Sequence, residues 1–257
     1  MTSLKSAFWI GYYGFLELFR NRFFLAILIL VLPLPAIAIL MDPYKLGFQV
    51  KIVKDLGIDI MSVFGFLVVL FVSFEQIIPD IERKSVYFIL SRIGNRTSYV
   101  FGRFLGIIFA LGLFHFVFSS FLFFFLRMYG EGWFWEVFSG GFVLFMKHCV
   151  WLSMILFFVT FTSKIVALSL GILFYALGHV LDVLRMLIEK NESGFLSWIC
   201  EVISLLIPDF SLFEANLTVV HEMNFQFPVF LFLFLYSIAV STFFLAAAGK
   251  ILTRRDL

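Results

Sequence analysis

The chain has 257 residues, of which 62% are hydrophobic and only 14% are charged. A soluble domain is about 45–50% apolar and about 25% charged, so the composition excludes a soluble enzyme or a soluble nucleic-acid-binding protein. The net charge of +2 gives no indication of a polyanionic partner, and two cysteines are too few for a disulfide scaffold. The composition instead predicts an all-α membrane protein whose helices span a lipid bilayer.

The N-terminal segment, residues 1–22, is predicted to form a helix that lies in the cytoplasmic interface of the membrane. Between residues 3 and 20, apolar side chains recur at helical spacing, and Lys5, Glu17 and Arg20 occupy other positions. This amphipathic pattern is typical of a helix on a lipid surface.

Six stretches are apolar and long enough to span a bilayer, which requires about 20 helical residues. They are residues 23–41, 56–78, 100–126, 141–163, 165–187 and 228–250. Pro33 and Pro35 are expected to kink the first span. Only Ser163 and Lys164 separate the fourth and fifth spans, which predicts a tight helical hairpin.

We therefore interpret residues 1–257 as a single transmembrane domain. Spans one to five occupy residues 23–187, and span six with a cytoplasmic tail occupies residues 228–257. Between them, residues 188–227 form a long outer loop. Its apolar run, residues 195–207, is too short to span and is predicted to be re-entrant.

Basic residues are distributed unevenly between the two sides of the predicted bundle. The side with both termini has 12 basic and five acidic residues, and the other side has seven basic and twelve acidic residues. Because Lys and Arg are retained on the cytoplasmic side, both termini are predicted to be cytoplasmic. We expect a multi-pass protein of the cell inner membrane.

The connection between the second and third spans, residues 79–99, has the densest charge in the chain. Pro79 and Asp80 provide a helix stop and a cap where the second span ends. A helix after them would turn an apolar face to the bundle and a charged face to the cytoplasm, and Gly94 would reverse the chain. This geometry suits an element that receives force from a soluble partner. The alternative is that its arginines only anchor the loop on the cytoplasmic side.

This segment resembles the signature of the type-2 ABC exporter permeases, most closely the branch associated with multicopper-enzyme maturation. The matching features are an acidic residue, a small residue, an apolar pair, a basic turn and an aromatic stretch that leads into the third span. In this chain they are Glu82, Ser85, Ile89 with Leu90, residues 92–96 and residues 99–106. Residues 153–171 are similar to the fourth and fifth helices of that family.

Three positions depart from the family pattern. Ser85 stands where glycine is frequent, Ile93 with Gly94 stands where proline and an apolar residue are usual, and Arg103 replaces a lysine. The helix–turn geometry is compatible with all three changes, with a looser turn at Gly94.

The resemblance implies a permease subunit that forms the substrate path of an ATP-driven exporter, as a homodimer or with a related subunit. ATP and Mg²⁺ would be bound by a separate ABC ATPase subunit, because no Walker motif occurs in this chain. We expect no catalytic site, metal, cofactor or nucleic-acid partner for the chain itself, and membrane lipid around it. The residues implied to dock the ATPase are Asp80, Glu82, Arg83, Lys84, Ser85, Ile89, Leu90, Arg92 and Arg96.

Few titratable side chains are expected at membrane depth. Glu75 is predicted to reach the interface or to pair with a base such as Arg103. His115 and His179 are predicted to be packed neutral side chains bonded to a carbonyl, rather than members of a proton or metal relay. Lys147 either attracts anionic cargo or extends to the lipid headgroups.

Two other functions stay open from the sequence. Trp133 and Trp135 lie in an outer loop that invites comparison with haem-handling proteins, although tryptophan is also common at membrane interfaces. A scaffold subunit of a membrane complex is the second alternative. Cys149 and Cys200 are both predicted on the outer side, and a disulfide between them is left open.

Overall fold

The computed structural model describes residues 3–36, 49–77, 96–129, 133–190, 207–214 and 227–254. Helices account for 91% of these residues, and none of the described residues lies in a strand. Four helical stretches in this part of the chain are long and apolar enough to cross a membrane: Val50–Glu75, Thr97–Met128, Glu136–Val159 and Phe227–Thr253. The predicted all-α class is confirmed for the described residues, and the four long apolar helices fit a membrane-embedded protein.

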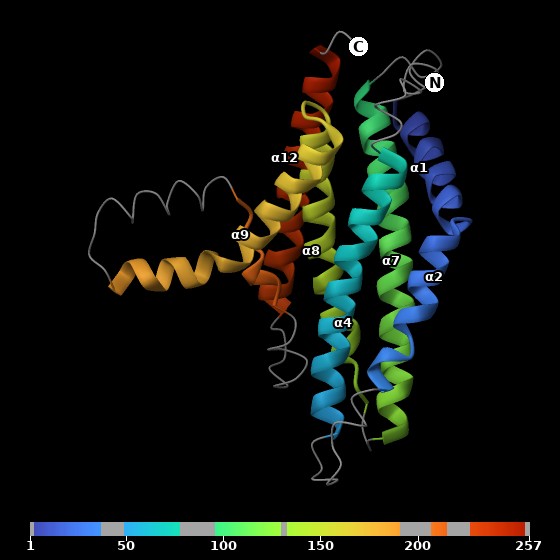
Figure 1. Ribbon diagram of the computed structural model, residues 1–257, viewed down its shortest axis with the longest axis vertical. Helices are drawn as coiled ribbons and strands as arrows, with labels where there is room; N and C mark the ends of the chain where they lie inside the picture. Colours follow the sequence, from blue (N-terminus) through green and yellow to red (C-terminus); the bar gives the residue numbers. More distant parts are fainter. Residues whose placement is uncertain are drawn as a thin grey trace.

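The helices form an elongated bundle in which most run along the long axis (Figure 1). The elements, in chain order, are α1 Ser3–Phe19, α2 Arg22–Val31, η1 Leu34–Ala36, α4 Gln49–Val72, η2 Ser73–Ile77, α7 Arg96–Tyr129, α8 Glu136–Val159, α9 Lys164–Lys190, η3 Ser211–Phe213 and α12 Phe227–Arg254. The start of α1 and the end of α12 lie at the same end of the bundle. The end of α4, the start of α7 and the turn between α8 and α9 also lie at that end.

Helix α8 is the centre of the bundle. It packs against α4, α7, α9 and α12. In its most apolar 18-residue stretch, 83% of the residues are buried, against 28% in the corresponding stretch of α12. Trp151 of α8 is fully buried, stacks on Phe66 with ring centroids 4.3 Å apart, and donates its indole N–H to the carbonyl of Gly171 at 2.8 Å. A single side chain of α8 thus joins α4 and α9.

The first predicted span differs from the structure. Helix α2 ends at Val31, and the two prolines lie in the turn and the short 3-10 helix that follow, rather than inside a kinked helix. Proline has no backbone N–H and restricts the residue before it, so two prolines separated by one residue end the helix. The remainder of the predicted span, residues 37–41, lies outside the described residues.

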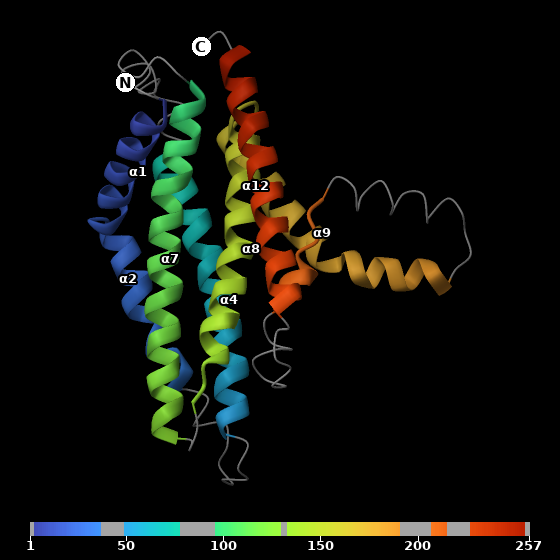
Figure 2. The ribbon, with the colours of Figure 1, turned by 180° about the vertical axis from the view of Figure 1, so that it is seen from behind.

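The predicted hairpin of the fourth and fifth spans is confirmed where α8 meets α9, since residues 160–163 alone separate the two helices. Helix α9 then departs from a straight span. Its first part returns beside α8, and its later part turns away from the bundle axis (Figures 1 and 2). The later part carries Asp182, Arg185 and Glu189 in the sequence, which favours surroundings more polar than the bilayer centre.

The predicted long outer loop is described only at residues 207–214, and most of the predicted re-entrant run, residues 195–206, lies outside the described residues. Residues 207–214 fold back into the bundle. The backbone N–H of Phe210 donates to the carbonyl of Gly178 in α9 at 3.1 Å, and that of Asp209 donates to the Tyr236 hydroxyl of α12 at 3.1 Å. Phe210 and Phe213 are fully buried, so this segment closes one side of the bundle between α9 and α12.

Helix α1, predicted to lie in the membrane interface, packs against α7 in the structure. Helix α1 lies beside α7 and follows its direction over most of its length (Figures 1 and 2). The reason is a seam of small residues: a Cβ atom at Gly102 would lie 2.7 Å from the Ala7 carbonyl oxygen, and one at Gly106 would lie 2.5 Å from the Gly11 carbonyl oxygen. Such close backbone approach is typical of small-xxx-small packing between helices in membranes.

Candidate functional site

The predicted docking segment for an ATPase lies between α4 and α7. Asp80, Glu82, Arg83, Lys84, Ser85, Ile89, Leu90 and Arg92 lie outside the described residues, and Arg96 opens α7 without a described side chain. The two flanking helices are described: α4 and α7 pack against each other. Their ends that lead into this connection lie at the end of the bundle where the chain starts and finishes.

Inside the bundle, the structure brings together a polar cluster that the sequence analysis did not assemble. His115 of α7 is 3% exposed and His148 of α8 is fully buried. Their rings are joined through His115 Nε2 and His148 Nδ1, which are 3.1 Å apart. His115 Nδ1 lies 2.8 Å from the Leu111 carbonyl oxygen, and His148 Nε2 lies 3.1 Å from the Ser62 carbonyl oxygen of α4.

Lys147, next in the sequence to one of these histidines, adds a cation to the cluster. Its side chain is only 5% exposed, and its amine donates to the Ser62 hydroxyl at 2.8 Å. The amine also lies 5.8 Å from the ring centroid of Tyr175 in α9, within the range of a cation–π contact. The cluster therefore includes side chains from α4, α7, α8 and α9.

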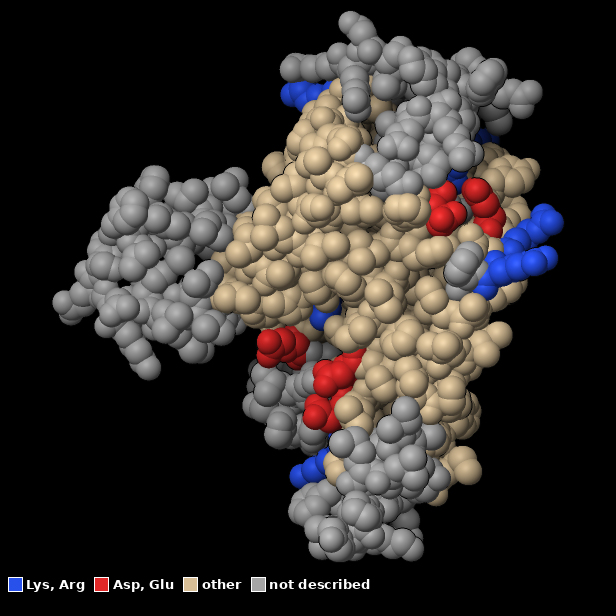
Figure 3. All heavy atoms as spheres, in the orientation of Figure 1, with Lys and Arg blue, Asp and Glu red and all other residues tan. Residues whose placement is uncertain are grey.

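A polar cavity of about 320 Å³ adjoins the cluster. It is lined by two carboxylates, one amine, one imidazole, one hydroxyl and two apolar side chains: Asp59, Glu214, Lys147, His179, Ser62, Leu144 and Phe213. Groups of both charge signs therefore face one space between α4, α8, α9 and η3. Elsewhere, the face of the molecule in Figure 3 is mostly uncharged, with Lys, Arg, Asp and Glu confined to small groups.

Gly65 of α4 creates the space that His148 occupies. A Cβ atom at Gly65 would overlap the imidazole ring, with His148 Nδ1 only 2.8 Å away. Because glycine has no Cβ, the ring extends from α8 to the backbone of α4 one turn before Gly65. The local sequence of α4 thus allows the bond between His148 and the Ser62 carbonyl.

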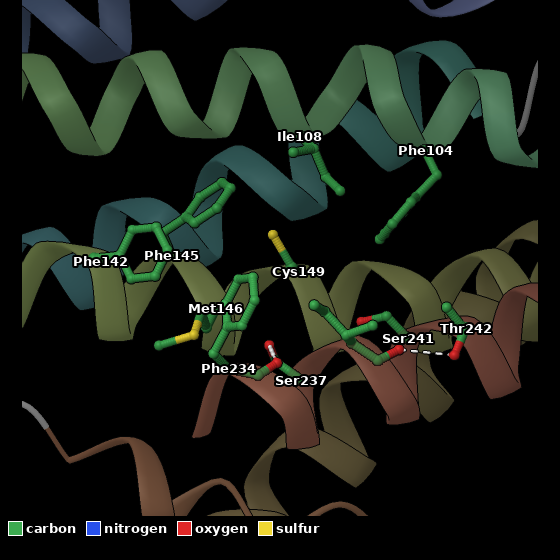
Figure 4. A pocket seen from close by; sticks show the side chains of 11 residues that line it. Phe104, Ile108, Phe142, Phe145, Met146, Cys149, Phe234, Ser237, Ser241 and Thr242 are labelled. Atoms are coloured by element: carbon green, nitrogen blue, oxygen red, sulfur yellow. Dashed lines mark hydrogen bonds between the residues drawn. The ribbon is translucent and has the colours of Figure 1, made fainter. Parts of the chain in front are cut away.

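A second feature is a groove in which phenylalanine is the most frequent lining residue. Three adjoining cavities of about 180, 620 and 370 Å³ share lining residues, and Phe145 of α8 lines all three. The smallest lies between α7, α8 and α12, where Phe104 and Ile108 face Ser237 and Ser241 across the space (Figure 4). We call the three cavities together the phenylalanine groove. Gly112, His115 and Ser119 line part of its wall along α7.

Two side chains in the wall of this groove are polar or reactive. Ser241 is 6% exposed, and its hydroxyl has no hydrogen-bond partner among the described residues. Cys149 is buried and is a free thiol, whereas Cys200 lies outside the described residues. The groove is therefore predominantly apolar, with a polar atom of α12 facing it.

Three side chains singled out in the sequence have defined surroundings in the structure. The His179 imidazole donates from Nδ1 to the Tyr175 carbonyl of its own helix, 2.8 Å away, so its predicted carbonyl partner is confirmed. His115 has the predicted carbonyl partner but also a second histidine as partner. Glu75 is exposed, and the base suggested for it, Arg103, instead donates to Glu17 at 3.2 Å.

The two tryptophans of the predicted outer loop form a stacked pair. The rings of Trp133 and Trp135 are 5.9 Å apart with an interplanar angle of 4°, and the guanidinium of Arg127 lies 5.3 Å from the Trp133 ring centroid. Both rings also lie near Phe123 of α7.

Among the described residues, no group of three or more His, Cys, Asp or Glu side chains is arranged to hold a metal ion.

No protein-family model matches the chain. No curated protein matches it either. The resemblance to the type-2 ABC exporter permeases therefore stays a prediction from the residues of the segment between α4 and α7 and of the hairpin between α8 and α9.

Proposed function

We propose that the chain is the permease subunit of an ATP-driven exporter of the cell inner membrane. Two copies, or one copy and a related subunit, would enclose the substrate path. A separate ATPase subunit would dock from the cytoplasm, the side on which both termini are expected to lie.

The observation that carries the proposal is where α4 ends and α7 begins. These two helices pack against each other and against α8, and their connecting ends lie at the end of the bundle shared by the first and last helices. That end also corresponds to the side with the excess of basic residues in the sequence. By the distribution of Lys and Arg, this end is the cytoplasmic one.

The mechanism follows from the packing of the helices. ATP binding would draw two ATPase subunits together, and a docked segment would transmit that movement to α4 and α7. Both helices contribute to the polar cluster through Ser62 and His115, so their displacement relative to α8 would rearrange the centre of the bundle. In alternating access, ATP binding would favour one of two packed arrangements of the bundle over the other.

The phenylalanine groove and the polar cavity support an amphiphilic cargo. The groove offers apolar walls along α7, α8 and α12, while the cavity presents Lys147 with the carboxylates of Asp59 and Glu214. Apolar walls with a few convergent polar groups are the usual composition of a small-molecule site.

The test uses the full chain reconstituted with an ATPase encoded in an adjacent reading frame. Reversing the charges at Glu82 and Arg83 should abolish co-purification with the ATPase and stimulation of ATP hydrolysis. The matched control is Lys51→Glu, an exposed charge reversal at the opposite end of α4, which should leave both intact.

Retention of ATPase binding and stimulation by the Glu82 and Arg83 variant would refute the docking assignment. A haem absorbance band in the purified chain would favour the haem-handling alternative. ATPase turnover that is indifferent to the presence of this chain would favour a scaffold subunit.

A further inference from the structure

The ring nitrogens of the two buried histidines form a continuous chain of three hydrogen-bonding contacts across three helices, and the Leu144 carbonyl is a further partner of the His148 ring. The chain begins at the Leu111 carbonyl oxygen, 2.8 Å from His115 Nδ1. It continues through the 3.1 Å contact between the two rings and ends at the Ser62 carbonyl oxygen, 3.1 Å from His148 Nε2.

The chemistry of these contacts fixes the number of protons that they need. A carbonyl oxygen only accepts, so His115 Nδ1 and His148 Nε2 must each carry a hydrogen. The contact between the two rings requires one more hydrogen, because two bare nitrogens facing each other would repel. Two neutral imidazoles carry two ring hydrogens together, and this chain of contacts requires three.

We propose that His115 and His148 form a site that binds one proton. The neutral pair leaves one of the three contacts without its hydrogen, and the proton taken from aqueous solvent completes it. The pair then carries one positive charge, shared between two rings.

The surroundings of the pair contain groups of both charge signs. The positive charge of Lys147 opposes the bound proton from α8, and that lysine also donates to the Ser62 hydroxyl. Asp59 of α4, Glu214 after η3 and His179 of α9 line the polar cavity that Lys147 and Ser62 share. The two carboxylates stabilise the charge of Lys147. Lys147, the charged form of His179 and the burial of both rings all oppose the bound proton, so the hydrogen bond that it completes must outweigh them.

The site borders a cavity. His115 lines the part of the phenylalanine groove with a volume of about 370 Å³, together with Ser119 and Gly112. The bound proton ties α7 to α8 through the ring-to-ring bond, and α8 to α4 through the Ser62 carbonyl. Its presence or absence therefore sets how firmly these three helices are held together, whatever drives their movement, and this inference does not rest on the exporter proposal.

Substitutions can remove the central bond and keep the outer ones. In His115→Asn the amide nitrogen replaces Nδ1 and retains the bond to Leu111, but no atom replaces Nε2. In His148→Gln the amide nitrogen replaces Nε2 and retains the bond to Ser62, but no atom replaces Nδ1. The comparison variant is His179→Asn, which keeps a donor to the Tyr175 carbonyl of its own helix and removes only a charge that would oppose the bound proton.

The experiment is nitrogen-15 NMR of histidine-labelled full-length protein in lipid bilayers, followed over pH. The wild type and His179→Asn should show one protonation step shared by His115 and His148, with ring-to-ring nitrogen coupling through the hydrogen bond. His115→Asn and His148→Gln should lose both the coupling and the shared step.

Either of two results in the wild type would overturn the proposal, and neither depends on the variants folding. One is that both rings stay neutral at every pH at which the protein is folded. The other is that each ring becomes fully protonated in a separate step. A His115→Asn protein in which His148 titrates as in the wild type would contradict it as well.

Discussion

The seam between α1 and α7 allows a quantitative test of the packing. In Gly106→Ala the new Cβ would lie 2.5 Å from the Gly11 carbonyl oxygen, whereas ordinary contact begins at 3.4 Å, so the backbones must separate locally by about 0.9 Å. Overpacking of this kind costs about 1–3 kcal/mol. Alanine also has a higher helix propensity than glycine by about 0.8–1 kcal/mol, which partly offsets the loss.

Gly112→Ala is the matched control, because it lies on the same helix and gains the same helix propensity. A Cβ at Gly112 would be 3.6 Å from the Phe145 ring, an ordinary contact. We expect Gly106→Ala to have a lower free energy of unfolding than Gly112→Ala by about 1–3 kcal/mol, measured by titration with a denaturing detergent in mixed micelles. Equal stabilities for the two variants would show that α1 does not lie against α7.

Three further predictions concern single contacts. Gly65→Ala should displace the His148 ring from the Ser62 carbonyl, because a Cβ would overlap the imidazole; unchanged His148 nitrogen-15 signals would contradict this. Trp151→Phe should lower the free energy of unfolding by about 1 kcal/mol from the lost bond to the Gly171 carbonyl, in the same detergent titration. Glu17→Gln should cost at most about 1 kcal/mol, since Glu17 is 61% exposed although Arg103 is only 10% exposed; a larger loss would mean that the ion pair is shielded from solvent.

The helical class and four of the spans could be predicted because bilayer-spanning helices need only length and apolar composition, both of which are local properties of the sequence. Hydropathy does not fix where a helix ends. The prolines at positions 33 and 35 end α2, although membrane helices often tolerate proline in their interior, and the outcome depends on neighbours far away in the chain.

The position of α1 and the histidine pair depend on such distant neighbours. The spacing Gly102-x-x-x-Gly106 was visible in the sequence and is a known signal for close helix packing, but its partner helix was not identifiable from spacing alone. His115 and His148 are 33 residues apart on different helices, so no local pattern links them. The glycine at position 65, in the middle of an apolar span, was the one local sign that a large side chain approaches there.

The central position of α8 determines what a movement of the bundle must change. Two residues of α8 bond to Ser62 of α4: His148 to its carbonyl and Lys147 to its hydroxyl. His148 is also bonded to His115 of α7. A force that moves α4 and α7 together against α8 must therefore break or shift all three bonds at once. Movement of α7 alone would affect only the bond between the histidines. The bound proton should therefore raise the energy needed for either movement by the energy of one hydrogen bond. The helices should move more easily when the histidine pair is uncharged than when it carries the proton.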